Sequence, residues 1–260
     1  MKIIFLGCTK FSEELLQDIL LNTSVEIAAI FTIPQDFHIS YSKTKVHNTN
    51  FSDLKPYAVL HNIPIYEVDS IRGKRITDYK ILLQEIKPDV ILVLGWYYMV
   101  PKSIRDLAKL GAWGIHASLL PRYAGGAPLV WAMINGEKES GVTLFRLDDG
   151  VDDGDILAQI SIPILDIDTI KEVYDRATEA SKKILQAVLT KPNEIIFTPQ
   201  DKKLIEVFPQ RKPDDGQINL NMNGEQMYNF IRAQSNPYPG AFIRTIDGKK
   251  IFIEKARLEV

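Results

Sequence analysis

The strongest constraint on the fold is a run of apolar residues, Val90-Ile91-Leu92-Val93-Leu94, that ends at Gly95. A strand that is apolar at every position, and not only at alternate ones, is covered on both faces, as in the parallel sheets of α/β proteins. Lys2–Leu6 and Val25–Ile33 have the same character, and between such runs apolar residues recur at helical spacing, as in 76–86. This alternation predicts an α/β fold with a Rossmann-like, mainly parallel sheet flanked by helices.

The second half of the chain adds a long helix and then changes in composition. Ile170–Leu189 carries apolar residues along one stripe, which predicts a helix packed on the sheet. Glu225–Ala233 predicts a further helix, and Asp247-Gly248 between two apolar segments is a strong signal for a hairpin. We therefore expect a main domain that carries the chemistry over residues 1–200 and a small C-terminal α+β subdomain, a helix plus a β-hairpin, over residues 201–260.

The composition narrows the classes of function. With 45% hydrophobic and 25% charged residues, the 260-residue chain is an ordinary globular protein. Its formal net charge of −2 argues against binding along a nucleic-acid backbone, although a local basic patch stays open. The single cysteine, Cys8, cannot form an intrachain disulfide, and no spacing of cysteine and histidine indicates zinc, so no metal is expected.

The N-terminal run MKIIFLG is too short for a signal peptide, and no apolar stretch reaches the ~20 residues of a membrane helix. We therefore expect a cytoplasmic protein with no membrane partner.

The candidate chemistry is concentrated between Gly114 and Asp155. Among the four histidines, His116 alone follows an apolar run directly and lies in a turn of polar and small residues. An acidic loop punctuated by glycine, 148–155, follows the next predicted strand. A histidine and a carboxylate brought together from two consecutive strand ends suit proton transfer during attack on a carbonyl group. The alternatives are that His116 is a satisfied core histidine and that Asp152 caps its loop.

Two further segments predict ligand contacts. The aromatic loop Gly95–Pro101 follows the central strand, and ligands of open parallel sheets lie beyond the carboxyl ends of the strands. Its three adjacent rings cannot all point one way, so at least one is expected to pack inward. The polar stretch 34–56 is predicted to be a flexible flap over a cleft. Lys10, at the start of a predicted helix, either meets an anion or is a solvated surface lysine.

An ordered series of motifs resembles the folate-dependent formyltransferase family, which includes methionyl-tRNA formyltransferases and N-formyltransferases of nucleotide-linked amino sugars. The motifs are His116–Pro121, Gly125–Pro128, Asn135–Glu137, Gly141–Thr143, Asp149–Asp155, Phe208–Gly216, Arg232-Ala233 and Pro237–Phe242. The series spans nearly the whole chain. The resemblance implies an enzyme whose formyl donor is 10-formyltetrahydrofolate.

The resemblance also implies roles for individual residues. It places the catalytic histidine at His116 and the aspartate that orients it at Asp152. The residues that it places against the folate are Leu94, Gly95, Trp96, Tyr97, Tyr98, Met99, Asp148, Asp149 and Val151. The candidates for the acceptor side are Lys10, Arg122, Tyr123, Arg211, Arg232 and Asn236. For the last three, the alternative is that they form ion pairs and turn caps between the two domains.

The chain departs from the family at Gly114, where the family has an asparagine. Glycine has no side-chain donor for an oxyanion, and the loss of one such donor typically lowers the rate ~10²–10³-fold. Another donor such as Ser118, a backbone N–H or an ordered water replaces it, or the enzyme is slower, or the chain is a folate- or nucleotide-binding paralogue with impaired catalysis. The intact motifs around His116 favour a working enzyme.

Two acceptors fit the resemblance. The amine of a nucleotide-linked amino-deoxy sugar needs a pocket and a few phosphate contacts, whereas tRNA needs a wide basic surface. The acidic balance favours the sugar, as does the end of the chain at Val260, which leaves no room for the longer basic C-terminal domain of methionyl-tRNA formyltransferases. Methionyl-tRNA is the alternative acceptor. The hairpin around Asp247-Gly248 could supply the interface of a homodimer.

Overall fold

The computed structural model describes residues 1–39, 44–69 and 73–259. Its centre is a seven-stranded sheet. From one edge to the other, the strands are β10 (Ile156–Pro163), β9 (Glu139–Arg146), β7 (Ala112–His116), β6 (Val90–Val93), β1 (Lys2–Leu6), β2 (Glu26–Thr32) and β5 (Ile65–Glu67). The strands from β7 to β5 are parallel, and β9 and β10 extend the β7 edge by antiparallel pairing. The predicted Rossmann-like, mainly parallel sheet is confirmed.

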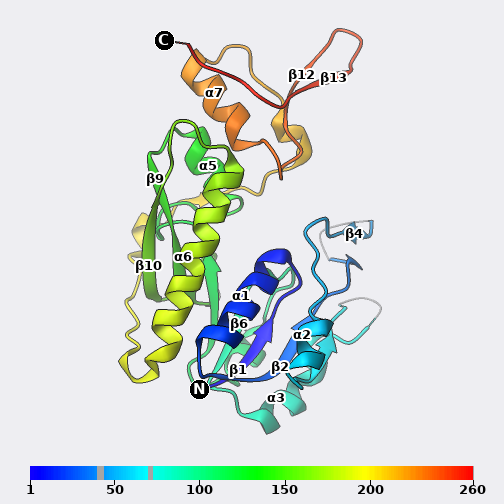
Figure 1. The fold of residues 1–260 in the computed structure, drawn as a ribbon, viewed down its shortest axis with the longest axis vertical. Helices are drawn as coiled ribbons and strands as arrows, with labels where there is room; N and C mark the ends of the chain where they lie inside the picture. The colour runs from blue at the N-terminus through cyan, green and yellow to red at the C-terminus, as the bar shows by residue number, and fades with distance from the viewer. Residues whose placement is uncertain (40–43, 70–72, 260) are drawn as a thin grey trace.

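Helices cover both faces of this sheet (Figure 1). They are α1 (Lys10–Asn22), α2 (Lys55–Leu60), α3 (Lys80–Ile86), α4 (Lys102–Arg105), α5 (Pro128–Ile134) and α6 (Ile170–Thr190). On one face, Leu16 of α1, Val130 of α5 and Ile184 of α6 belong to one apolar core. On the other face, Leu83 of α3 and Ile104 of α4 belong to a second core. The central strand β6 lies between the two layers, which is why every one of its positions is apolar.

The helix that follows the aromatic loop is short. α4 ends at Arg105, and the chain from there to Leu110 forms turns. The amides of Lys109 and Leu110 donate to the carbonyls of Pro88 and Asp89, just before β6. These amides therefore connect the segment to the sheet and cannot continue the helix.

The stretch 34–56 contains more regular structure than the sequence predicts. The strands β3 (Asp36–Phe37) and β4 (Val46–His47) form a short antiparallel pair in it. Phe37 is fully buried and packs on the rings of Tyr97 and Tyr98. This stretch therefore lies against the aromatic loop after β6; residues 40–43 are outside the described part of the chain.

The C-terminal residues form a small α+β unit that packs on α5 (Figure 1). Its elements are the 3₁₀ turn η4 (Pro213–Gly216), α7 (Gly224–Ala233), β12 (Ala241–Arg244) and β13 (Lys250–Ile253). The predicted helix and hairpin are both present. Between this unit and α6, the chain returns to the main sheet region, where β11 (Val207–Phe208) pairs with β8 (Ala124–Gly125). The proposed division at residue 200 thus falls within a segment that contacts the main domain.

Candidate active site

His116 and Asp152 lie next to each other at the end of β7. His116 is the last residue of β7 and is 8% exposed. Its Nδ1 lies 3.4 Å from Oδ2 of Asp152. Arg146, at the end of β9, pairs with Trp113 near the start of β7. The loop after β9 must therefore fold back along β7 to bring Asp152 to His116. The sequence predicted that the two side chains come from two consecutive strand ends, and the structure differs because β9 runs antiparallel to β7.

The hydrogen bond at Nε2 fixes which nitrogen of His116 can exchange a proton. Nε2 lies 2.7 Å from the backbone carbonyl oxygen of Tyr123. A carbonyl oxygen only accepts hydrogen bonds, so Nε2 carries the hydrogen in this bond. In the neutral ring the lone pair is then on Nδ1, the nitrogen that faces Asp152. The geometry makes Nδ1 the proton acceptor and places a carboxylate beside it to stabilise the imidazolium.

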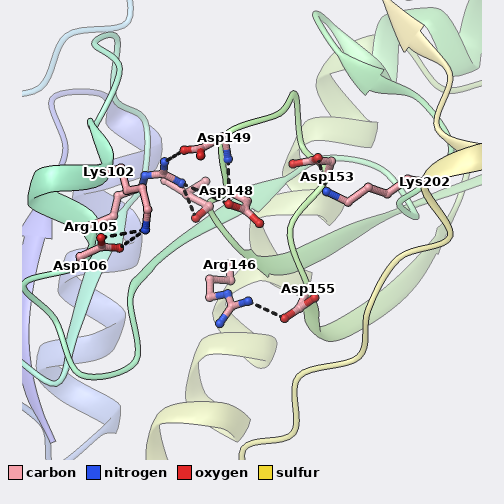
Figure 2. A network of polar contacts seen from close by, with 10 residues as sticks. Lys102, Arg105, Asp106, Arg146, Asp148, Asp149, Asp153, Asp155 and Lys202 are labelled. Atoms are coloured by element: carbon pink, nitrogen blue, oxygen red, sulfur yellow. Dashed lines mark hydrogen bonds and ion pairs between the residues drawn. The ribbon is translucent and has the colours of Figure 1, made fainter.

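The other aspartates of the acidic loop are paired with cations from three other segments (Figure 2). The contacts are Arg105 with Asp149, Arg105 with Asp148 at 4.0 Å, Arg146 with Asp155 at 2.7 Å, and Lys202 with Asp153 at 2.7 Å. Arg105 is buried and also donates to the carbonyl of Leu147 at 2.8 Å. Asp152 thus remains as the loop carboxylate that faces His116. Sequence reasoning missed Arg105, because nothing in the local pattern of α4 marks it.

Gly114 faces an apolar contact and not an open pocket. A Cβ atom added there would lie 3.0 Å from Cδ2 of Leu147 and 3.5 Å from Cε1 of Phe145. Ser118, the side chain proposed as a substitute donor, is fully buried, and its hydroxyl donates to the carbonyl of Arg122 at 2.7 Å. The hydrogen of this hydroxyl is therefore used within the turn after β7.

The aromatic loop after β6 divides into an anchored beginning and an outward end. Leu94 is buried and its carbonyl accepts from Ser12 Oγ at 2.6 Å, while the carbonyl of Gly95 accepts from the amide of Cys8 at 3.2 Å. Trp96 and Tyr98 pack against the apolar cores beneath. Tyr97 and Met99 are exposed. The sequence predicted that at least one ring of this loop packs inward, and two of them do, those of Trp96 and Tyr98.

The aspartates and valine proposed for the folate are on the surface of the acidic loop. Asp148, Asp149 and Val151 are all exposed. Asp149 is already paired with Arg105. Their contact with a folate remains a prediction.

The acceptor-side candidates fall into an exposed group and an engaged group. Lys10, Arg122 and Asn236 are largely exposed. Arg122 pairs with Glu137 at 2.5 Å, and this pairing raises the pKa of Arg122. At the start of α1, the amides of Cys8 and Lys10 are bonded to Gly95 and Asn50, so they do not form an anion site with Lys10.

Tyr123, Arg211 and Arg232 are engaged in contacts within the protein. Tyr123 is stacked on Phe208 and its hydroxyl donates to Glu137 at 2.8 Å. Arg232 is 5% exposed, and its guanidinium donates to the carbonyls of Leu165 and Asp168. Burial lowers the pKa values of Arg211 and Arg232. Both arginines join the C-terminal unit to the main domain, through carbonyl groups and an aromatic ring and not through ion pairs, and their role toward an acceptor remains a prediction.

The described residues form neither a metal site nor a membrane-spanning helix. Across 1–39, 44–69 and 73–259, no group of three or more His, Cys, Asp or Glu side chains is placed to hold a metal ion. Within the same ranges, no helix has the length and apolar character needed to cross a bilayer. An open hollow of about 440 Å³ lies in the C-terminal unit, between residues 217–220 and β12, and it includes none of the site candidates.

The comparisons with known proteins agree on one family. The family model described as formyl transferase matches residues 1–189, and the model of the formyl transferase C-terminal domain matches residues 211–260. The chain belongs to the formyl transferase family. It is a folate-dependent formyltransferase. The resemblance inferred from the motifs is confirmed.

Relatives with different acceptors are similar to this formyltransferase. It is 34% identical over 257 residues to a methionyl-tRNA formyltransferase of Lactobacillus gasseri, a match that covers 98% of this chain and 78% of the relative. It is 39% identical over 213 residues to the bifunctional polymyxin resistance protein ArnA of Wigglesworthia glossinidia brevipalpis, covering 80% of this chain and 32% of that protein. A sugar N-formyltransferase from a Shewanella species has the same fold, with a TM-score of 0.72, 19% identity, and coverage of 100% and 99% of the two chains.

Proposed function

We propose that this formyltransferase moves the formyl group of 10-formyltetrahydrofolate to the amine of a nucleotide-linked amino-deoxy sugar. The observation that carries the choice of acceptor is the state of the cations in the C-terminal unit. Residues 211–260 contain eight basic and six acidic side chains. Three of the basic side chains are in ion pairs: Lys249 with Asp247, Lys250 with Asp214, and Arg257 with Glu259. Arg232 is buried and Arg211 is stacked between rings. These contacts leave few cations for the wide basic surface that tRNA binding requires.

In the proposed reaction, His116 and Asp152 handle the proton. As the amine nitrogen bonds to the formyl carbon it becomes positively charged and must lose a proton. Nδ1 of His116 takes this proton, and Asp152 stabilises the imidazolium that results. The proton then passes to the folate nitrogen as its bond to the formyl carbon breaks. Both nitrogen centres are neutral at the end, and His116 returns to its starting state.

The folate is proposed to bind beside the aromatic loop. Nε1 of Trp96 is a buried donor without a hydrogen-bond partner among the described residues. Buried donors in native proteins normally have a partner, and a folate acceptor group would provide one. The exposed side chains of Tyr97 and Met99 are proposed to continue this surface. The donor supplies the formyl group; the protein supplies the binding surface and the proton acceptor.

The acceptor is proposed to approach from the side of Tyr123. The backbone of Tyr123 contacts His116, and its ring stacks on Phe208 at 4.7 Å. Trp131 lies 5.7 Å from Phe208 and is partly exposed. Aromatic faces next to the exposed guanidinium of Arg122 suit a planar base and a phosphate, respectively. The backbone contact between Tyr123 and His116 supports placing the acceptor on this side of the catalytic pair.

Methionyl-tRNA is the second candidate acceptor, because the curated relatives that match nearly the whole chain are methionyl-tRNA formyltransferases. An assay with 10-formyltetrahydrofolate, a panel of nucleotide-linked amino sugars and charged initiator tRNA distinguishes the two. We expect turnover of one sugar, with a rate that changes little from 50 to 200 mM salt. His116→Ala should lower kcat by about 10²–10⁴-fold.

Two outcomes would contradict the proposal. Turnover with tRNA alone, at a rate that drops steeply as salt rises, would identify tRNA as the acceptor. Retained binding of the folate without turnover of any amine would identify a paralogue that has lost its chemistry.

A further inference from the structure

The segment that connects α6 to the C-terminal unit passes directly beside the acidic loop. The backbone of Thr198 exchanges two hydrogen bonds with Ile156 at the start of β10, each 2.8 Å long. Four residues later, Lys202 pairs with Asp153 at 2.7 Å, and Figure 2 shows it reaching the loop from this segment. Gln200 lies between these two anchors and is 9% exposed. It also lies between the ranges of the two family models, which end at residue 189 and begin at residue 211.

Gln200 bonds to the loop backbone on both sides of Asp153. Its Nε2 donates to the carbonyl of Asp152 at 2.8 Å and to the carbonyl of Gly154 at 2.7 Å. An amide nitrogen has two hydrogens, so both donors are used in holding the loop. Its Oε1 is buried and has no hydrogen-bond partner among the described residues. The two loop carbonyls, and not an interaction of Oε1, therefore account for the orientation of this side chain.

Asp152 has a backbone conformation that is uncommon for residues other than glycine. Its φ is +50°, in the left-handed region, which aspartate enters more readily than most residues, and contacts with the surrounding backbone stabilise it there. The amide of Gly125 holds the carboxylate, donating to Oδ2 at 2.8 Å. Gln200 holds the carbonyl of the same residue. The loop is also tight against β9, since a Cβ atom at Gly154 would lie 1.8 Å from the carbonyl oxygen of Arg146.

We propose that Gln200 is a positioning residue for formyl transfer: its side-chain amide keeps Asp152 in the left-handed conformation that directs the carboxylate to Nδ1 of His116. The inference rests on the role proposed above for Asp152. It makes the segment between the two domains part of the active site, because this segment supplies the donor that sets the geometry of the catalytic pair.

Replacing Gln200 by Met and by Glu tests this role. Met keeps the length of the side chain and removes both donors, and it also removes the unpartnered oxygen. Glu keeps the shape but places a carboxylate against two carbonyl oxygens. We expect kcat of formyl transfer to fall by about 10–100-fold in both variants, because small displacements of a catalytic group have effects of this size. The KM for the folate should change by less than about threefold, because Gln200 bonds to the backbone of Asp152 and Gly154 and to none of the residues proposed for the folate.

The matched control is Gln186→Met. Gln186 donates through the same nitrogen to both carboxylate oxygens of Asp18, at 2.8 and 2.9 Å, and joins α6 to α1. This variant loses the same kind of bond outside the site. Its kcat should equal that of the wild type.

A double-mutant cycle separates positioning from general stabilisation. If Gln200 acts through Asp152, then Gln200→Met should have no further effect in an Asp152→Asn background. A crystal structure of Gln200→Met should also show Asp152 outside the left-handed region or its carboxylate further than 3.4 Å from Nδ1 of His116. A merely structural role would lower kcat equally in both backgrounds and would leave this geometry unchanged.

The outcomes distinguish the two proposals. Asp152→Asn at the wild-type rate would overturn both the proposed role of Asp152 and the inference on Gln200. A large loss in Asp152→Asn, with wild-type rates in Gln200→Met and Gln200→Glu, would overturn the inference on Gln200 alone. If the Met variant does not fold, the Glu variant, which retains size and polarity, decides the question.

Discussion

At the scale of single residues, neighbouring groups set the chemistry more than residue types do. The backbone carbonyl of Tyr123 fixes the hydrogen of His116 on Nε2, and this leaves Nδ1 to face Asp152. At Cys8 the surroundings remove reactivity instead of providing it. It is a potential nucleophile by type, but burial raises the pKa of its thiol to about 12, so it is uncharged and inert at neutral pH.

Gly114 is similarly explained by what surrounds it, and this leads to a prediction. We expect Gly114→Asn to lower the free energy of unfolding by about 1–3 kcal/mol, because the new side chain would press on Leu147 and Phe145. Gly114→Asn combined with Leu147→Ala should recover part of this loss, because the second change opens the space. Urea unfolding measures both, with Leu147→Ala as the control. If the donor reaches the reacting group, kcat of the double variant should exceed that of Leu147→Ala. A Gly114→Asn protein as stable as the wild type would show that Leu147 does not fill the position.

At the scale of elements, the start of α6 is held by an ion pair whose carboxylate is buried. Asp168, 3% exposed, accepts from Arg176 at 2.8 Å and from the amide of Leu165 at 2.6 Å. Burial alone would raise the pKa of Asp168, but the bonds from Arg176 and Leu165 outweigh it and hold the pKa below its ordinary value. The same short segment accepts from Arg232 of α7. This ion pair therefore stabilises both α6 and the attachment of the C-terminal unit.

A lowered carboxyl pKa makes this contribution dependent on pH. The stabilisation is complete above the ordinary value of 3.8 and is lost as the pH falls through the lower value in the folded protein. We expect Arg176→Ala to cost about 3 kcal/mol at pH 7, since it leaves a buried charge without its partner. The difference from the wild type should shrink below about pH 4. Urea unfolding at pH 7 and pH 3 measures it. Lys171→Ala, which removes an exposed pair on the same helix, should cost far less stability than Arg176→Ala. An equal loss at both pH values would contradict the role of Asp168.

The elements also show how far sequence reasoning reaches. The continuous apolar run of β6 and the stripe of α6 determine burial directly, so periodicity predicts both. The end of α4 could not be predicted from periodicity. It depends on the amides of Lys109 and Leu110, which bond to carbonyls just before β6, and only the folded chain brings these groups together. In the site, motif order located His116 and Asp152. It could not locate Arg105 or Gln200, because each acts through a backbone carbonyl of a loop that only the folded chain brings near.

At the scale of the whole molecule, two parts are joined by a small number of specific contacts. The C-terminal unit has its own core of Ile218, Phe230, Ile231 and Ala241, and Ile134 of α5 packs against it. The hydroxyls of Tyr174 and Tyr238 bond at 2.8 Å across the same junction. The connecting segment meanwhile contacts the acidic loop and β8. The position of the C-terminal unit and the geometry of the active site are therefore linked through one continuous stretch of chain.

Arg211 is the contact at this junction with the most specific geometry. Its guanidinium lies 4.7 Å from the ring of Trp131 in the main domain and 5.7 Å from that of Phe230 in α7. It also donates to Oε1 of Gln234 at 2.8 Å. Burial lowers its pKa, but a guanidinium stays charged at every physiological pH, so the cation–π contacts persist.

Replacing this residue tests whether the two parts are coupled as the structure indicates. We expect Arg211→Ala to loosen the C-terminal unit by about 1–3 kcal/mol, because desolvated cation–π contacts and charged hydrogen bonds are both lost. Hydrogen exchange should accelerate in α7 and in the hairpin of β12 and β13, while the amides of β1 and β6 keep their protection. The exchange rates of Arg211→Lys should lie between those of the wild type and those of Arg211→Ala, because lysine keeps the charge without the planar guanidinium group. Uniform acceleration across the sheet would mean that the two parts unfold as one. Unchanged exchange with a raised KM for the acceptor would instead assign Arg211 to the acceptor, the role that the sequence first suggested for it.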